Sequence, residues 1–327
     1  MQIISQAPIV QGTRVLVRYD LDVPVKKGEV LEKYRLETGL DTLNYIISKG
    51  AIPVICGHLG KPDGKAIKEL STLQFIPFFD KKLGKNTYEI TENLRFDPRE
   101  EENNLDFAKE LISKTQTTLY INESFATSHR KHASIVAVTS LLPSFAGFRL
   151  VKEVETITSA LTKPQKPLIT IVGGAKIESK LPTINKFLEI SDAVLLGGKI
   201  GIEWQATQKD FPKNLYLPTD YAKNKLDIGS LTIEGYTQII STAKTIIWAG
   251  PLGVYTDKNY ILGTKKIAQA IVNSKAFSLV GGGDTVTALN MLGLLDKVGF
   301  ASTGGGAMLE FVSKGTLPGL EVLGYHG

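Results

Sequence analysis

The sequence predicts an α/β protein with two doubly wound, parallel-sheet domains of the Rossmann-like kind, joined by a helix that serves as a hinge. Three observations support this prediction. Short β-branched runs alternate with amphipathic stretches along the chain, as expected for βαβ units. Glycine follows the strand-like runs of the second half. A helical segment flanked by prolines divides the chain near its middle.

The expected elements follow one another in a regular order. In the first half, residues 14–18 and 52–56 read as strands, and apolar residues between them recur at helical spacing. The second half contains a longer series of strand-like runs, each followed by glycine and then by a helical pattern. The apolar residues at helical spacing in the first half are Leu36, Leu40, Leu43 and Ile47. The strand-like runs of the second half are residues 168–172, 193–196, 245–248 and 277–280.

A domain boundary is expected between Pro143 and Pro167. Residues 150–161 read as a helix, and the proline-containing segment at 163–167 leads into a new buried strand. The resulting division is residues 1–149 for a first domain, residues 150–166 for a linker helix and residues 167–327 for a second domain, with the last residues as candidates for packing back on the first domain.

Composition narrows the class of protein. Apolar residues make up 43% of the 327 residues and charged residues 22%, which is normal for a globular protein. The net charge of +5 suits a small anionic substrate as well as a nucleic acid, but no run of Lys or Arg forms a nucleic-acid-binding tail. The single cysteine, Cys56, excludes an internal disulfide and favours a reducing compartment. We expect a cytoplasmic monomer with small-molecule substrates and with neither nucleic-acid nor membrane partners.

Glycine-rich segments follow five strands of the second half. In a parallel sheet, the carboxyl ends of the strands form the edge that binds ligands. Glycine lets backbone N–H groups approach an anion there, and a helix N-terminus adds free donors. Each turn alone could be only a tight connection, but five together favour a crevice for phosphate or a nucleotide. The segments are residues 173–176, 197–199, 249–253, 281–285 and 302–306.

Two lysines and one aspartate strengthen this interpretation. Lys176 and Lys180 lie four residues apart at the start of a helical pattern, so both can face the crevice. The alternative is that both are solvated surface lysines. Asp284 follows three glycines at the start of another helix, as an N-cap, as a magnesium ligand, or as both. The chain has no Walker A motif, which excludes the P-loop class.

The strand ends of the first half carry charge instead of glycine. Arginine binds phosphate and carboxylate through paired hydrogen bonds, so several arginines and a histidine at one sheet edge suit a small polyanion. Each residue alone could be an ordinary surface charge, and their shared location favours a binding site. The residues are Asp20, Asp22, Arg35, His58, Lys61, Arg95 and Arg130. A polyanion site in one domain and a nucleotide site in the other indicate a hinge-closing kinase.

Eight sequence blocks, in order, resemble those of the phosphoglycerate kinase family. The first-half blocks are VLVRYDLDVP from Val15, GHLGKPDG from Gly57, ENLRF from Glu92 and YINESFATSHRKHAS from Tyr120. The second-half blocks are GGAKIESK from Gly173, WAGPLGVY from Trp248, GGGDT from Gly281 and STGGGAMLEF from Ser302. The resemblance covers nearly the whole chain. It implies magnesium-dependent, reversible phosphoryl transfer between 1,3-bisphosphoglycerate and ADP, giving 3-phosphoglycerate and ATP.

The resemblance also implies roles for single residues. Arg35, Lys176 and Lys180 would be catalytic, and Asp284 would hold the magnesium that accompanies ATP or ADP. The triose would be bound by Asp20, Leu21, Asp22, Arg35, His58, Leu59, Gly60, Lys61, Arg95 and Arg130. The nucleotide would be bound by Gly174, Lys176, Lys180, Gly198, Gly250, Pro251, Thr256, Asp257, Gly282, Gly283, Asp284, Thr285, Gly304 and Gly305.

Four residues depart from the family pattern. Asp22 stands where the family has asparagine, Lys61 where it has arginine, and Ala249 where it has asparagine. Thr256 stands where a glutamate is expected for the ribose hydroxyls, with Asp257 beside it. The departures at Ala249 and Thr256 bear on nucleotide affinity more than on the class of reaction.

Two segments, residues 62–92 and 201–227, are shorter than in the family, and the second borders the expected adenosine pocket. Two alternatives therefore stay open. One is a catalytically weakened relative that binds a nucleotide or phosphorylated metabolite as a sensor or scaffold. The other is an acyl-phosphate kinase for a related small acid.

Overall fold

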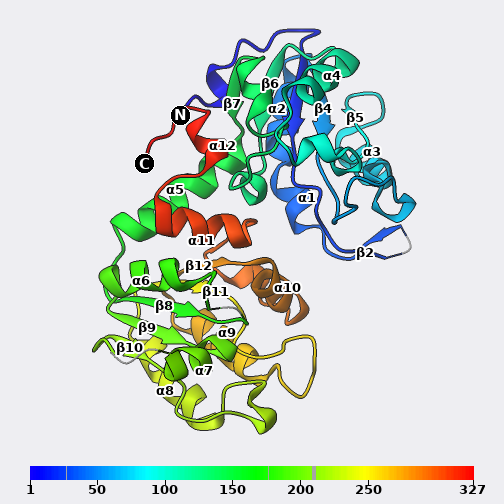
Figure 1. Ribbon diagram of the computed structural model, residues 1–327. Helices are drawn as coiled ribbons and strands as arrows, with labels where there is room; N and C mark the ends of the chain where they lie inside the picture. The colour runs from blue at the N-terminus through cyan, green and yellow to red at the C-terminus, as the bar shows by residue number, and fades with distance from the viewer. Residues whose placement is uncertain (27, 176, 208–210) are drawn as a thin grey trace. The chain divides into compact units, whose positions relative to one another are not determined.

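The computed structural model describes residues 1–26, 28–175, 177–207 and 211–327. It contains two compact units, one formed by Met1–Val154 with Gly315–Gly327 and the other by Glu155–Lys314. Each unit is built on one parallel sheet with helices packed against it (Figure 1). The predicted fold class of two doubly wound α/β domains is confirmed.

The first unit contains a five-stranded parallel sheet in the order β5-β4-β1-β6-β7. A small antiparallel hairpin, β2-β3, lies outside this sheet. The strands are β1 (Arg14–Arg18), β2 (Val25–Lys26), β3 (Glu29–Val30), β4 (Ile52–Cys56), β5 (Glu89–Ile90), β6 (Leu119–Asn122) and β7 (Ser144–Ala146). The helices are α1 (Tyr34–Thr38), α2 (Leu40–Ser48), α3 (Ile76–Leu83), α4 (Leu105–Thr115) and α12 (Pro318–Glu321).

Alternation along β1 builds a core on each face of this sheet. Successive side chains of a strand point to opposite faces, so Val15 and Val17 join one buried cluster while Leu16 joins another. The first cluster includes residues of α1, α2 and α3, and the second includes residues of α4. The strand expected at residues 14–18 is buried on both sides and is found with those bounds.

The helical pattern between β1 and β4 forms two helices instead of one. Gly39 separates α1 from α2. A Cβ at this position would lie 2.6 Å from Cε2 of Tyr19, so only glycine fits beside the Tyr19 ring. The break places the short helix α1 next to the carboxyl end of β1.

The second unit contains a six-stranded parallel sheet in the order β10-β9-β8-β11-β12-β13. Figure 1 shows α6 and α11 on one side of this sheet and α7 and α8 on the other. The strands are β8 (Leu168–Val172), β9 (Ala193–Leu196), β10 (Leu215–Tyr216), β11 (Thr245–Ala249), β12 (Phe277–Gly281) and β13 (Phe300–Ala301). The helices are α6 (Leu181–Ile190), α7 (Gly198–Thr207), α8 (Ser230–Ser241), α9 (Leu262–Asn273), α10 (Gly283–Met291) and α11 (Gly305–Lys314).

One helix carries the chain from the first unit into the second. This helix, α5 (Phe148–Thr162), includes the helical segment expected at residues 150–161. After α11 the chain returns to the first unit, where Gly319 N–H donates to the carbonyl of Ser128 at 2.8 Å. Within the part of the chain that the structure describes, no helix is long and apolar enough to cross a membrane.

Each sheet has one point where the direction of strand addition reverses. In the first unit, β4 and β5 extend the sheet on one side of β1, and β6 and β7 extend it on the other. In the second unit, β9 and β10 extend it on one side of β8, and β11, β12 and β13 extend it on the other. Ligands of doubly wound sheets bind at the carboxyl ends of the strands beside this point. The two points are therefore where a site is to be sought.

Candidate active site

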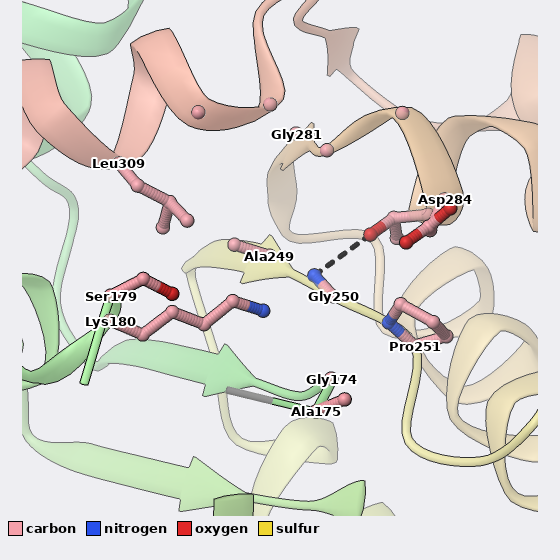
Figure 2. Close-up of a pocket in the computed structure, with 15 residues that line it drawn as sticks. Gly174, Ala175, Ser179, Lys180, Ala249, Gly250, Pro251, Gly281, Asp284 and Leu309 are labelled. Atoms are coloured by element: carbon pink, nitrogen blue, oxygen red, sulfur yellow. Dashed lines mark hydrogen bonds between the residues drawn. The ribbon is translucent and has the colours of Figure 1, made fainter. Parts of the chain in front are cut away.

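A pocket of about 370 Å³ opens at the reversal point of the second sheet. Turns that follow β8, β11 and β12 contribute to it together with the start of α11 (Figure 2). Glycine is the most frequent residue in its lining, which also carries one amine and one carboxylate. The lining residues are Gly174, Ala175, Ser179, Lys180, Ala249, Gly250, Pro251, Gly281, Gly282, Gly283, Asp284, Thr285, Gly305, Gly306 and Leu309.

Glycine is required where the turns after β8 and β11 meet Lys180. Gly174 and Gly250 have positive φ angles of 107° and 96°, which favour glycine. A Cβ on Gly174 would lie 2.6 Å from Lys180 Nζ, and a Cβ on Gly250 would lie 2.8 Å from the same atom. The two glycines thus leave room for the amine at the floor of the pocket.

Among the residues that the structure describes, Lys180 is the one positively charged side chain that lines this pocket. It is the N-cap residue of α6, which begins at Leu181. Its amine donates a hydrogen bond to the carbonyl of Gly173. Burial lowers the pKa of Lys180 to about 8, although Asp284 acts in the opposite direction. Lys176, the other predicted lysine, lies outside the described residues.

Asp284 is the carboxylate of the pocket, but it does not cap a helix. The N-cap of α10 is Gly282, whose φ of 109° suits glycine, and Asp284 is the second residue of the helix. The predicted N-cap role is therefore wrong. Asp284 is exposed, and its Oδ1 accepts a hydrogen bond from the hydroxyl of Tyr255 at 3.1 Å. Burial and the neighbouring Asp284 raise the pKa of Tyr255 to about 12.

Thr285, the next residue of α10, connects two turns of the pocket through a hydrogen bond. Thr285 is fully buried, and its Oγ1 accepts a hydrogen bond from Gly250 N–H at 2.8 Å (Figure 2). This bond fixes the turn after β11 to the first turn of α10. The Gly250 N–H is thereby occupied.

The side chains that line the pocket could hold a magnesium ion only together with oxygen atoms of a bound substrate. The described residues include no group of three His, Cys, Asp or Glu side chains that could hold a metal. Mg²⁺ commonly binds through one or two carboxylates together with substrate phosphates and waters. Asp284, the single carboxylate among the lining residues, fits that arrangement.

Of the predicted nucleotide residues that the structure describes, four do not line the pocket. A Cβ on Gly198 would lie 3.1 Å from the carbonyl oxygen of Gly174, so Gly198 is its near neighbour. Gly304 lies beside the lining residue Gly305. Thr256 is exposed, and Asp257 uses its Oδ1 to accept a hydrogen bond from Asn259 N–H at 2.8 Å within its own turn.

In the first unit, cationic side chains surround His58 at the reversal point of the sheet. Arg18 Nη2 lies 3.0 Å from His58 Nδ1. Because a guanidinium can only donate, Nδ1 accepts this bond and the ring proton is on Nε2. Burial, with Arg18 and Arg95 acting in the same direction, holds the pKa of His58 well below its usual range. His58 is therefore a neutral imidazole amid positive charge.

The two aspartates after β1 have different surroundings. Asp20 is buried, and its Oδ2 has no hydrogen-bond partner among the residues described. Arg35 Nε lies 3.8 Å from this oxygen, but burial raises the pKa of Asp20 above its usual value. Asp22 is more exposed, and its Oδ1 accepts a hydrogen bond from Gly60 N–H at 2.9 Å. Asp20 thus presents an acceptor oxygen that a ligand hydroxyl could satisfy.

Two arginines hold the backbone of the turns around these aspartates. Arg35 Nη1 donates to the carbonyl of Asp22 at 2.9 Å, and Arg95 Nη1 donates to the carbonyl of Gly60 at 3.1 Å. Gly60 has a φ of 64° and lies where the chain turns after β4. Five of the predicted residues, Asp20, Asp22, Arg35, His58 and Arg95, are thus linked with Gly60 in one network.

The remaining predicted residues contribute in other ways. Leu21 and Leu59 are buried and belong to the core that supports the turns. Lys61 is exposed. Arg130 is also exposed, and its charge adds to those of Arg95 and Arg18, which together with burial lower the pKa of His132 to about 3.

The prediction missed three buried ionisable residues beneath this site. Arg18 is fully buried and donates to Ser134 Oγ at 2.9 Å, while Ser134 Oγ donates to Glu100 Oε1 at 2.6 Å. His132 Nδ1 lies 3.9 Å from the same Glu100 oxygen. The one sequence signal was Arg18 itself, a charged residue that directly follows the apolar residues 15–17 of its strand. Glu100 carries no such signal.

Comparison with known proteins identifies one family. The profile described as phosphoglycerate kinase matches residues 5–215 and 205–314. A phosphoglycerate kinase from Leptospira biflexa is 35% identical over 382 aligned positions, which cover 96% of this chain and 96% of the relative. One from Thermomicrobium roseum is 33% identical over 382 positions, which cover 96% of this chain and 97% of the relative.

Solved structures show the same likeness. The phosphoglycerate kinase from Coxiella burnetii matches with a TM-score of 0.82 at 31% identity, over 98% of each chain. The one from Pyrococcus horikoshii OT3 matches with a TM-score of 0.85 at 26% identity, over 99% of this chain and 98% of that one. The 382 aligned positions exceed the 327 residues of this chain, so the curated relatives carry residues that it lacks.

Proposed function

The chain belongs to the phosphoglycerate kinase family, and on this premise we propose that it transfers a phosphoryl group reversibly between 1,3-bisphosphoglycerate and ADP, giving 3-phosphoglycerate and ATP. The acceptor in the direction of ATP use is the carboxyl group of 3-phosphoglycerate. The observation that supports this most directly is the pairing of two different sites. One unit holds an arginine-rich network around a neutral histidine, and the other holds a glycine-lined pocket with one lysine and one carboxylate.

In the first unit, the network would bind the triose. Guanidinium groups bind phosphate and carboxylate through directed hydrogen bonds. Arg35, Arg95 and Arg130 supply the charge, and His58 offers its Nε2–H as a neutral donor. The unpartnered Oδ2 of Asp20 would accept the hydrogen bond of the ligand's hydroxyl. Lys61 adds a mobile charge where the family has arginine.

In the second unit, the pocket would bind the phosphates of the nucleotide. The glycines of its turns let the backbone approach phosphate oxygens without interference from side chains. Lys180 would contact the transferring phosphoryl group, and Lys176 is assigned the same task by the family resemblance alone. The remaining nucleotide residues are proposed on the same basis: Gly174, Gly198, Gly250, Pro251, Thr256, Asp257, Gly282, Gly283, Asp284, Thr285, Gly304 and Gly305.

Magnesium would be held by Asp284 together with the nucleotide phosphates, and it would neutralise charge on those phosphates. Tyr255 would orient Asp284 through its hydroxyl. Hydrogen bonds to a ligating carboxylate fix its orientation and support metal affinity.

Transfer would be direct, with no covalent enzyme intermediate. Phosphoryl transfer depends mainly on positioning and on cations that stabilise the transition state. Arg35 and Lys180 come from different units, so we propose that hinge closure about α5 brings the two substrates together and excludes water. We also propose that the protein is a cytoplasmic monomer that acts on its small-molecule substrates alone.

The test is the rate of the Arg35→Ala variant in a coupled assay with ATP, magnesium and 3-phosphoglycerate. Removal of a transition-state arginine typically lowers kcat on the order of 10³-fold. Arg99→Ala is the matched control, because Arg99 pairs with Asp97 and Glu110 outside the network. Retention of more than about a tenth of kcat, worth only about 1.4 kcal/mol, would contradict the role of Arg35. Binding of both ligands by wild type without turnover would instead support a sensor.

A further inference from the structure

The helix that carries Arg35 is too short to fix its own position. Helix α1 has five residues, and isolated helices of that length are unstable in water. Its N-cap residue, Lys33, makes no capping hydrogen bond through its side chain. The orientation of Arg35 therefore depends on what packs against α1.

Two contacts hold the carboxyl half of α1. Leu36 is fully buried in the core of the first unit. The hydroxyl of Tyr19 donates to the carbonyl of Leu36 at 2.6 Å. Both contacts tie the helix to the sheet beneath it, because Tyr19 directly follows β1.

The first residue of α1 contacts a different element. Tyr34 precedes Arg35, and its hydroxyl accepts a hydrogen bond from Arg149 Nη2 at 3.3 Å. The Arg149 guanidinium also lies 5.6 Å from the centroid of the Tyr34 ring, within the range of a cation–π contact. Arg149 belongs to the first turn of α5, the helix that leads into the second unit.

Arg149 is itself held in place. Its Nε and Nη2 donate to Glu153 Oε1 at 3.1 and 2.8 Å, one turn further along α5. Its backbone N–H donates to the buried Glu123 Oε1 at 3.1 Å. Arg149 is 8% exposed and Glu153 is fully buried, so solvent screens this ion pair little. A guanidinium fixed in this way can position the tyrosine that it contacts.

We propose that Tyr34 and Arg149 are positioning residues that fix α1, and with it the Arg35 guanidinium, to the first turn of α5. The helix that connects the two units then also determines where the transition-state cation lies. A change in the direction of α5 is transmitted to Arg35 through Arg149 and Tyr34. This inference rests on the proposed function, because it takes Arg35 to act on the transferring group.

Tyr34→Phe is the test variant, because it removes only the hydroxyl and keeps the ring. Arg149→Met is less suitable, since it leaves the Glu153 carboxylate buried without its cation. Tyr45→Phe is the matched control. The Tyr45 ring packs edge-to-face on Phe148 of α5 at a centroid distance of 5.3 Å, and its hydroxyl makes no hydrogen bond with the residues that the structure describes.

The first measurement is hydrogen–deuterium exchange of the peptide that contains α1, which does not depend on turnover. We expect Tyr34→Phe to accelerate exchange of this peptide relative to wild type and Tyr45→Phe, with an unchanged melting temperature. Equal exchange in all three proteins would overturn the inference. This result decides the positioning of α1 even if wild type shows no kinase activity, which would defeat only the proposed function.

The second measurement is a double-mutant cycle on kcat with Arg35→Ala. We expect Tyr34→Phe to lower kcat at least threefold with the KM for 3-phosphoglycerate within twofold of wild type, because small displacements of a catalytic group are costly. In the Arg35→Ala background the same change should have no further effect. An equal loss in both backgrounds would show that Tyr34 does not act through Arg35 and would overturn the inference.

Discussion

The protonation of Lys180 should make nucleotide binding sensitive to pH. The amine must be protonated to attract phosphate, and burial lowers its pKa to about 8. The cationic form is therefore present below pH 8 and is lost as the pH rises through that value. For a group with this pKa, about nine tenths are protonated at pH 7 and about one tenth at pH 9. We predict that ADP binds about tenfold more weakly at pH 9 than at pH 7, a difference of about 1.4 kcal/mol.

Calorimetric titration with ADP at constant magnesium measures this difference. Lys180→Arg is the control, because arginine stays charged across the range. The variant should lose the pH dependence whatever its absolute affinity. A flat profile for wild type, or the same slope in Lys180→Arg, would refute the argument that a titrating Lys180 holds the phosphates.

Three further predictions concern groups around the two sites. Tyr255→Phe removes the hydrogen bond to Asp284 and should weaken Mg²⁺ binding to the ADP complex on the order of tenfold, measured by titration of metal; an unchanged metal affinity would contradict the orienting role of Tyr255. ADP and 2′-deoxy-ADP should bind within about threefold, roughly 0.7 kcal/mol, because Thr256 offers no carboxylate and Asp257 is engaged in its own turn; a tenfold preference for ADP that disappears in Asp257→Ala would assign the ribose contact to Asp257. Burial raises the pKa of Glu123 from 4.5 to about 8. Between these two pH values the native state keeps a proton that the unfolded state has lost, so the free energy of unfolding should fall by roughly 1.4 kcal/mol per pH unit as the pH rises. Denaturant unfolding of Glu123→Gln should lack this fall, and an equal fall in the variant would rule out Glu123 as its source.

The strands could be predicted because their chemistry is local. Residues 14–18 and residues 52–56 each contain a mostly buried run between polar segments. Such a run can be assigned to a strand of a doubly wound sheet without knowing its distant neighbours. The break at Gly39 could not be predicted in the same way. It depends on the Tyr19 ring, which reaches the position only after β1 and α1 have packed together.

The members of the first-unit network could be predicted where the residue type alone indicates anion binding. Arg35, His58 and Arg95 are charged or polar residues that follow strands or begin a helix, and the structure links them in one network. Glu100 and His132 were missed because their importance lies in partners far along the chain. The N-cap role expected of Asp284 was wrong for a related reason, since a backbone conformation that only Gly282 adopts readily decides where α10 begins.

The central claim is that this chain moves a phosphoryl group between ATP and the carboxyl group of 3-phosphoglycerate. Phosphorus NMR of the wild-type protein with ATP, magnesium and 3-phosphoglycerate tests it most directly, with hydrazine present to trap the acyl phosphate. We predict that ATP is converted to ADP only when 3-phosphoglycerate is present, with one acyl hydrazide and one inorganic phosphate formed for each ADP. Binding of both ligands without conversion of ATP, or conversion that does not require 3-phosphoglycerate, would contradict the claim.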